Sequence, residues 1–273
     1  MTETIQGLRR GLQVLRVLQN KGTSSLQDLH VTTRISKPSL LRILNTLAEA
    51  GAVTRRLADG RFRASAGLLR MDRRGDRHDR IAEAAGPVLD QLCRKISWPS
   101  DVLVPAGTHL EIRETSRTHS PFRVHIPTVG QPVGWLMTGV GRAYLAFCSD
   151  KERERTIQRL RKTRMLDDRL AHDPRRLAKI LADTRARGYG IRDDQFSGGA
   201  YGAAPLRDGL AALAVPLLGA DRIYGVMNIL WIRTAFTVEQ FAQRHLGDLR
   251  EAAGQIVSAV EAHDVVAGRA RRA

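Results

Sequence analysis

Cysteine and long apolar runs are both scarce in this chain of 273 residues. The two cysteines, Cys93 and Cys148, stand outside the C-x-x-C and H-x-x-x-H spacings that hold metals. The sequence therefore argues against a disulfide framework and against a structural zinc site. The longest apolar stretches, 209–220 and 225–232, are shorter than the roughly 18–20 residues needed to cross a bilayer. We expect no membrane helix, no metal and no cofactor.

A secretion signal is also missing from the start of the chain. The opening residues, MTETIQGLRRGLQVLRVL, are amphipathic and contain neither an apolar core segment nor a small-residue cleavage site. The expected location is the cytoplasm, and a DNA-binding function would place the protein at the nucleoid.

Aromatic residues make up only 5% of the chain, and acidic residues are outnumbered by basic ones, 28 to 44. The low aromatic content and the absence of an RNP-type motif argue against an RNA-binding protein that stacks bases. The formal net charge of +16 predicts a polyanionic partner. A genomic base composition that favours arginine codons would produce a similar surplus. Residues 1–80 carry 16 Lys+Arg against 7 Asp+Glu, so the charge is densest in the first third.

The first 50 residues predict three helices. Leu8, Leu12 and Leu15 recur at helical spacing in a segment that ends near Gly22. Ser24 or Ser25 is suited to cap a short second helix that stops around 32–33. A third amphipathic helix follows the sequence SKPS at 36–39, where proline fits the first turn, and Gly51 is suited to end it.

Two short extended runs, 52–57 and 61–64, follow the third helix and are joined by Asp59-Gly60, which favours a tight hairpin. This order is that of a winged helix-turn-helix, whose third helix enters the major groove of DNA. The candidate DNA-binding residues lie on the start of the third helix and on the hairpin. They are Ser36, Lys37, Ser39, Leu40 and Arg42 for the bases, and Arg55, Arg56, Arg61 and Arg63 for the phosphates.

Three segments are expected along the chain. Residues 1–66 form the DNA-binding domain, 67–80 a charged linker helix, and 81–273 a second domain. The second domain is predicted to be α+β, a largely antiparallel sheet with helices packed on it. Its expected helices are 81–96, 142–147, 153–160, 174–187 and 238–261, and its expected strands are 101–105, 110–115, 122–126, 210–217 and 223–232.

Several motifs together resemble the IclR-type bacterial transcription regulators over nearly the whole chain. They are GLRRGLQVL at 7–15, SKPSLLRIL at 36–44, VGQP at 129–132, RGYG at 187–190 and LAVPL at 213–217. Within that family, WPSD at 98–101, RET at 113–115 and YLAFC at 144–148 resemble the regulators of 3-hydroxyphenylpropionate catabolism.

The resemblance implies an N-terminal winged helix and a C-terminal effector domain with a GAF-like fold, usually in a dimer or tetramer. Such proteins repress or activate catabolic operons in response to small, often aromatic or carboxylated metabolites. The implied partners are double-stranded operator DNA, a small-molecule effector and a second copy of the chain, with RNA polymerase as a further candidate.

The resemblance also implies which residues line the effector pocket. They are Leu136, Met137, Thr138, Gly139, Val140, Gly141, Asp193, Asp194, Ala214, Asn228 and Leu230. A glycine-rich turn that leads into a helix can cradle an anion with its backbone N–H groups. Asn228 stands in an apolar strand and must find a polar partner if it is buried.

Other interpretations remain open. An enzyme that carries a basic appended domain is the alternative, but no nucleophile elbow, zinc motif or His/Asp pairing supplies catalytic residues. Trp135, Met137 and Trp231 fit either an aromatic pocket or the core, and His125 is expected to be structural. The glycine-rich stretch 197–204 lacks a phosphate-loop pattern, and a lid over the pocket is its functional alternative.

Overall fold

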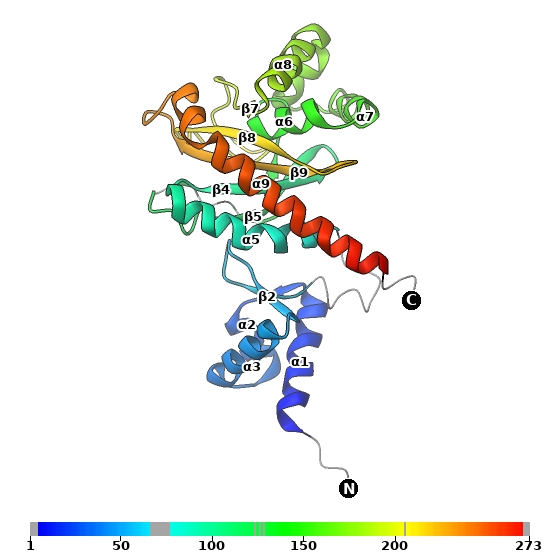
Figure 1. The fold of residues 1–273 in the computed structure, drawn as a ribbon, viewed down its shortest axis with the longest axis vertical. Helices are drawn as coiled ribbons and strands as arrows, with labels where there is room; N and C mark the ends of the chain where they lie inside the picture. The colour runs from blue at the N-terminus through cyan, green and yellow to red at the C-terminus, as the bar shows by residue number, and fades with distance from the viewer. Residues whose placement is uncertain are drawn as a thin grey trace. The chain divides into compact units, whose positions relative to one another are not determined.

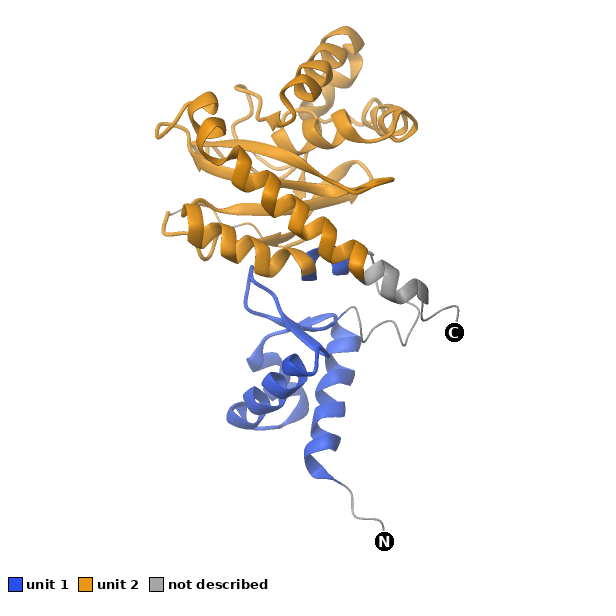
Figure 2. Cartoon of the chain, in the orientation of Figure 1, with its two compact units in different colours: residues 1–83 blue, residues 84–273 orange. Residues whose placement is uncertain are grey.

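The computed structural model describes residues 5–65, 77–122, 124, 125, 127, 129–204 and 206–269. They belong to two compact units, Met1–Glu83 and Ala84–Ala273 (Figure 2). Most of the expected linker, 67–76, lies outside the described residues, and the helix that follows begins at Arg77.

The first unit contains the three predicted helices and the predicted hairpin. The helices are α1 (Gln6–Lys21), α2 (Leu26–Thr33) and α3 (Lys37–Glu49), and the hairpin strands are β2 (Val53–Arg55) and β3 (Phe62–Ala64). A further strand, β1 (Thr23–Ser24), pairs with β3 and makes the sheet three-stranded. Buried side chains from all three helices form one core, in which Val14, Leu29 and Leu40 are fully covered.

Local sequence explains where α2 and α3 begin. Ser25 Oγ accepts from the Asp28 N–H at 3.1 Å, and the Asp28 carboxylate accepts from the Ser25 N–H at 3.0 Å, which completes a capping box. Ser36 is the N-cap of α3 as expected, but its hydroxyl donates to Ser39 Oγ at 3.0 Å instead of accepting from the backbone.

The second unit is built on an antiparallel six-stranded sheet in the order β6-β5-β4-β9-β8-β7. Its strands are β4 (Ser100–Ala106), β5 (His109–Thr115), β6 (Pro132–Val133), β7 (Gly190–Ile191), β8 (Leu210–Leu218) and β9 (Ile223–Ile232). Figure 1 shows helices on both faces of this sheet. They are α5 (Arg77–Ile96) and α9 (Val238–Arg269) on one face, and α6 (Gly139–Phe147), α7 (Asp150–Leu160), the 3-10 helix η1 (Leu166–His172) and α8 (Pro174–Arg187) on the other.

Alternation along β9 separates the two faces. Trp231 stacks on Phe241 of α9, with ring centroids 3.9 Å apart. Val226 belongs to the core beneath α6, and Asn228 and Leu230 follow it at two-residue steps. Because both faces are covered, β8 and β9 are nearly continuous apolar runs, and the predicted α+β class is confirmed.

One prediction about this unit was wrong. The described residues of the expected strand 122–126, which are 122, 124 and 125, lie in a loop, and Phe122 stacks on Trp98 with ring centroids 4.0 Å apart. For Trp135 and Trp231 the sequence left a pocket or the core open, and the structure places both in the core, 1% and 0% exposed. In the described residues, no helix is long and apolar enough to cross a membrane.

Candidate functional site

The start of α3 presents most of its predicted DNA-binding residues to solvent. Ser36, Lys37 and Arg42 are exposed, and Ser39 is partly exposed. Leu40 is 0% exposed and packs in the core of the unit, because it lies on the face of α3 turned toward the other helices. A side chain with no accessible surface cannot reach a base edge, so the prediction for Leu40 was wrong.

The four arginines of the hairpin differ in exposure to solvent. Arg55 and Arg61 are exposed. Arg63 is 8% exposed and its Nε donates to Thr54 Oγ1 at 3.1 Å, so this guanidinium is used inside the hairpin and the phosphate role predicted for it was wrong. The Arg56 side chain is 10% exposed and pairs with Asp59 at 3.6 Å, which leaves little of it for a phosphate.

A cavity lies in the second unit between the sheet and the N-terminus of α6. Its walls come from β4, β5, β6, β8 and β9, from the start of α6, from the loop that follows β5 and from the segment that follows β7. The residues are Asp101, Leu103, Ile112, Arg117, His125, Gln131, Val133, Thr138, Gly139, Val140, Arg192, Phe196, Gly199, Leu206, Asp208, Ala212, Asn228 and Leu230. Its volume is about 70 Å³.

Five of the predicted pocket residues line this cavity: Thr138, Gly139, Val140, Asn228 and Leu230. Thr138 is the N-cap of α6, accepting from the Gly141 N–H at 3.2 Å and donating to the Gly134 carbonyl at 2.6 Å. The first N–H groups of a helix have no partner within the helix. Gly139 and Val140 therefore bring a locally positive helix end to the cavity wall.

The other predicted pocket residues lie elsewhere. Leu136 and Ala214 are 0% exposed and belong to the core that α6 covers. Gly141 is packed against the backbone, since a Cβ added there would lie 1.9 Å from the Trp135 carbonyl oxygen. Met137 is half-buried, and its carbonyl accepts from the Asp193 N–H at 2.9 Å.

The two predicted acidic residues also lie outside the lining of the cavity. The Asp193 carboxylate pairs with the buried guanidinium of Arg142 on α6, and Asp194 is exposed. None of these six residues lines the cavity: Leu136, Gly141 and Ala214 are packed in the core, Asp193 is paired with Arg142, Met137 is half-buried and Asp194 is exposed.

The residue before these acids, Arg192, is the stronger feature of the cavity and was not predicted. Its side chain is 7% exposed, and its Nη2 donates to both oxygens of Asp208 at 2.9 and 3.0 Å. Its Nη1 donates to the Leu210 carbonyl at 3.0 Å, while its Nε is buried without a partner among the described residues. The sequence signal for this role is the arginine that directly precedes the two acids in IRDD at 191–194.

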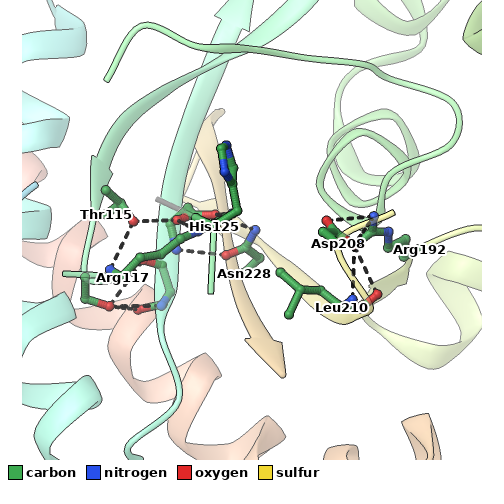
Figure 3. Close-up of polar contacts among 10 residues, drawn as sticks. Thr115, Arg117, His125, Arg192, Asp208, Leu210 and Asn228 are labelled. Atoms are coloured by element: carbon green, nitrogen blue, oxygen red, sulfur yellow. Dashed lines mark hydrogen bonds and ion pairs between the residues drawn. The ribbon is translucent and has the colours of Figure 1, made fainter. Parts of the chain in front are cut away.

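A second polar group occupies the β4 side of the cavity (Figure 3). The Asp101 carboxylate, 1% exposed, accepts from Arg117 Nε at 3.0 Å and Arg117 Nη2 at 2.6 Å. It also accepts from Thr115 Oγ1 at 2.7 Å and Asn228 Nδ2 at 3.2 Å. Asn228 thus finds the polar partner expected of it. Arg117 Nη1 donates to the His125 carbonyl at 2.7 Å, and His125 is exposed at the cavity wall instead of lying within a strand.

Burial lowers the pKa of Arg192, and the positive charges of Arg233 and Arg117 act in the same direction, while Asp208 opposes them. Two guanidinium groups therefore face one cavity, each held by one carboxylate. The helix end and the unpartnered Arg192 Nε–H together suit a small anion with several acceptor oxygens.

Comparison with known proteins places the chain in a family. Residues 7–57 match the IclR helix-turn-helix domain, and residues 76–258 match the C-terminal domain of the bacterial transcriptional regulator IclR. The chain is an IclR-family transcriptional regulator. The predicted family, its DNA-binding helix-turn-helix domain and its GAF-like effector domain are thereby confirmed, and the enzyme alternative is set aside.

Individual relatives of this IclR-family regulator are distant. The HTH-type transcriptional regulator BhcR of Paracoccus denitrificans is 24% identical over 218 residues, which cover 79% of this chain and 77% of that protein. The Pca regulon regulatory protein of Pseudomonas putida is 24% identical over 243 residues, 88% of this chain and 78% of that protein. An IclR homologue from Microbacterium hydrocarbonoxydans, solved with 4-hydroxybenzoate, superposes with a TM-score of 0.53 at 18% identity, covering 94% of this chain and 99% of that one.

Proposed function

We propose that this IclR-family regulator controls a catabolic operon by binding a small carboxylated metabolite, aromatic or short-chain, in the cavity of its second unit. The single observation that carries the proposal is the buried Arg192 guanidinium: its Nε has no partner among the described residues, and Arg192 lines the same cavity as the start of α6. A carboxylate there would accept from Arg192 Nε and from the N–H groups of Gly139 and Val140. The Microbacterium relative, which binds an aromatic acid, supports this ligand class.

The DNA interface that we propose consists of the residues that the fold leaves accessible. Ser36, Lys37, Ser39 and Arg42 at the start of α3 would contact base edges, and Arg55 and Arg61 on the hairpin would contact phosphates, with Arg56 at its margin. Two DNA-binding units are needed to bind the two halves of a pseudo-palindromic operator. We therefore infer that the chain forms a homodimer or a homotetramer. RNA polymerase is a further partner in this scheme, and the cytoplasm, at the nucleoid, is its setting.

The cavity must widen to accept an aromatic acid. Its volume of about 70 Å³ is well below the roughly 300 Å³ at the lower end of ligand pockets. The strands of the sheet are held by backbone pairing, whereas Arg117, His125, Phe196 and Asp208 lie on connections between strands. Ligand entry would displace those connections, which gives the effector different affinities for two arrangements of the protein.

The test is a titration of the purified full-length protein against benzoate, 4-hydroxybenzoate, protocatechuate, pyruvate and glyoxylate, followed by thermal unfolding. A compound that binds the native state raises the melting temperature, and above its dissociation constant the rise grows with the logarithm of its concentration. We expect at least one acid to do so while the matching amide or alcohol does not. Equal effects of acids and their uncharged analogues would contradict a carboxylate site.

A further inference from the structure

The loop that follows β5 connects the cavity to α5. Arg117, near the start of this loop, holds Asp101 with two of its nitrogens and the His125 carbonyl with the third, at 2.7 Å. Asp101, Arg117 and His125 all line the cavity. One side chain therefore joins the floor of the cavity to two points on the loop that are eight residues apart.

The same loop is fastened to α5 and to the residues that end it. His119 Nδ1 lies 2.9 Å from Asp90 Oδ1, and Ser120 Oγ donates to the Ser97 carbonyl at 2.8 Å. Phe122 stacks on Trp98 with an interplanar angle of 16°. Each partner belongs to the last two turns of α5 or directly follows them, so a shift of the loop must change contacts at this end of the helix.

The end of α5 has a backbone conformation that these contacts help to hold. Ser97 has a φ of 65°, which is uncommon for a residue with a side chain, and its N–H donates to the Cys93 carbonyl at 2.8 Å. From this end the helix extends back through Pro87 to Arg77, so residues 77–83 are counted with the first unit and 84–96 with the second. α5 is thus the helix through which the chain passes from the first unit into the second.

We propose that Arg117 is a positioning residue that couples occupancy of the cavity to α5 through residues 116–122. The inference rests on the proposed function, since it explains how a ligand in that cavity would reach the DNA-binding unit. A ligand oxygen that accepts from Arg117 competes with the His125 carbonyl, and widening of the cavity displaces the same loop. Both changes alter the contacts of His119 and Ser120 with α5. Because these contacts differ between the empty and the occupied cavity, a ligand favours one arrangement of α5 over another.

The test is a mutant cycle on the full-length protein without any ligand, read by amide hydrogen exchange. Arg117→Lys keeps a cation beside Asp101, but one ammonium cannot also replace the fork that reaches the His125 carbonyl. We expect exchange in residues 88–97 to quicken about three- to tenfold, the loss of roughly one net hydrogen bond. In the background of His119→Ala, Ser120→Ala and Phe122→Ala, Arg117→Lys should have a much smaller effect on α5, because the three contacts described above are then removed.

Exchange in α8 is the internal reference, and the measured quantity is the ratio of α5 to α8 rates, which cancels a global change in stability. Gln91→Ala, an exposed position on α5 that faces none of these contacts, is the matched background, in which Arg117→Lys should keep its full effect. Equal effects of Arg117→Lys with and without the side chains of His119, Ser120 and Phe122, or faster exchange confined to residues 117–125, would overturn the proposal. Because no ligand is added, failure of the acid titration above would refute the proposed function alone.

Discussion

Arg192 and Asp208 form a buried ion pair in which the arginine donates twice through Nη2 and leaves its Nε–H unused. A buried donor without an acceptor costs about 1–3 kcal/mol. Arg192, which carries this unpartnered donor, lines a cavity together with the first turn of α6. A ligand oxygen that filled the vacant position would recover that free energy, and this is the basis of the affinity that we expect.

Arg192→Lys should weaken binding of the stabilising acid roughly ten- to 100-fold, which corresponds to about 1.5–3 kcal/mol for a hydrogen bond to a charged group. The ammonium preserves the charge beside Asp208 but has no equivalent of the Nε–H in the fork. The measurement is isothermal titration with the acid identified by thermal unfolding. Arg233→Lys, a neighbouring change that leaves the cavity wall intact, should bind as the wild type does; a similar loss in both variants would show that general charge, and not the Nε–H, attracts the ligand.

Gly141→Ala should destabilise the second unit by more than about 2 kcal/mol, the range of strained or overpacked core substitutions. The added Cβ would lie 1.9 Å from the Trp135 carbonyl oxygen and 2.4 Å from two further backbone atoms of Trp135, which cannot move aside as a flexible side chain could. Gly254→Ala in α9, where nothing lies within 4 Å of the added Cβ, should instead stabilise by about 0.5–1 kcal/mol. Urea unfolding of the two variants measures both changes, and a Gly141→Ala protein as stable as wild type would contradict the packing described here.

The fold of the first unit was predictable because strong local signals agree there. The capping residue Ser25, proline in the first turn of α3 and the Asp59-Gly60 turn each fix an element without tertiary information. Strands of two residues, such as β1 and β7, have no period to detect, and they form only because a longer strand is available for pairing. The apolar segment around Phe122 alternates like a strand, yet Trp98 provides a ring to stack on and no strand provides a register.

Arg42→Ala should reduce affinity for operator DNA about fivefold to 150-fold, the cost of 1–3 kcal/mol that accompanies loss of a base contact. Arg61→Ala should instead lower the slope of log affinity against log salt by about one, as expected when one phosphate contact is lost. Fluorescence anisotropy with labelled DNA from upstream of the gene measures both. Arg63→Gln is the control: its guanidinium is used within the hairpin, so the salt slope should not change, and a lowered slope would restore Arg63 to the DNA interface.

Asp168 provides a pH-dependent prediction. Its carboxylate accepts from Tyr201 and from Thr163 through Oδ2, while Oδ1 is buried without a partner in the described part of the chain. Burial raises the pKa of Asp168 above its ordinary value of 3.8, and the neighbouring Asp167 adds to the shift. The folded protein therefore binds a proton more readily than the unfolded chain, and this contribution to stability is lost as the pH rises through the folded pKa.

Relative to Asp168→Asn, the wild type should gain stability as the pH falls from 7 toward 4.5. Tyr201→Phe removes a donor to the ionised carboxylate, so its gain should begin at a higher pH than in the wild type. Urea unfolding at several pH values gives these differences. A wild type that loses stability against Asp168→Asn over the same range would mean that the pKa of Asp168 is lowered.

The cavity was only partly predictable. Thr138, Gly139 and Asn228 belong to local patterns, a capped helix start and a polar residue in an apolar strand, which remain visible in the sequence. Arg117 and Asp101 meet only through the pairing of β4 with β5, and Arg192 meets Asp208 only because the segment after β7 folds back to β8. Asp193 was predicted as a ligand residue because nothing in the sequence shows that Arg142 neutralises it.

The most direct test of the central claim is the operator dissociation constant, measured with and without a saturating amount of the acid that most raises the melting temperature, in the wild type and in Arg192→Lys. Couplings between sites in regulatory proteins are typically about fivefold to 150-fold. The account predicts a change of this size in the wild type and little change in the variant at the same acid concentration. A wild-type operator affinity that stays constant in the presence of every acid that binds would contradict it.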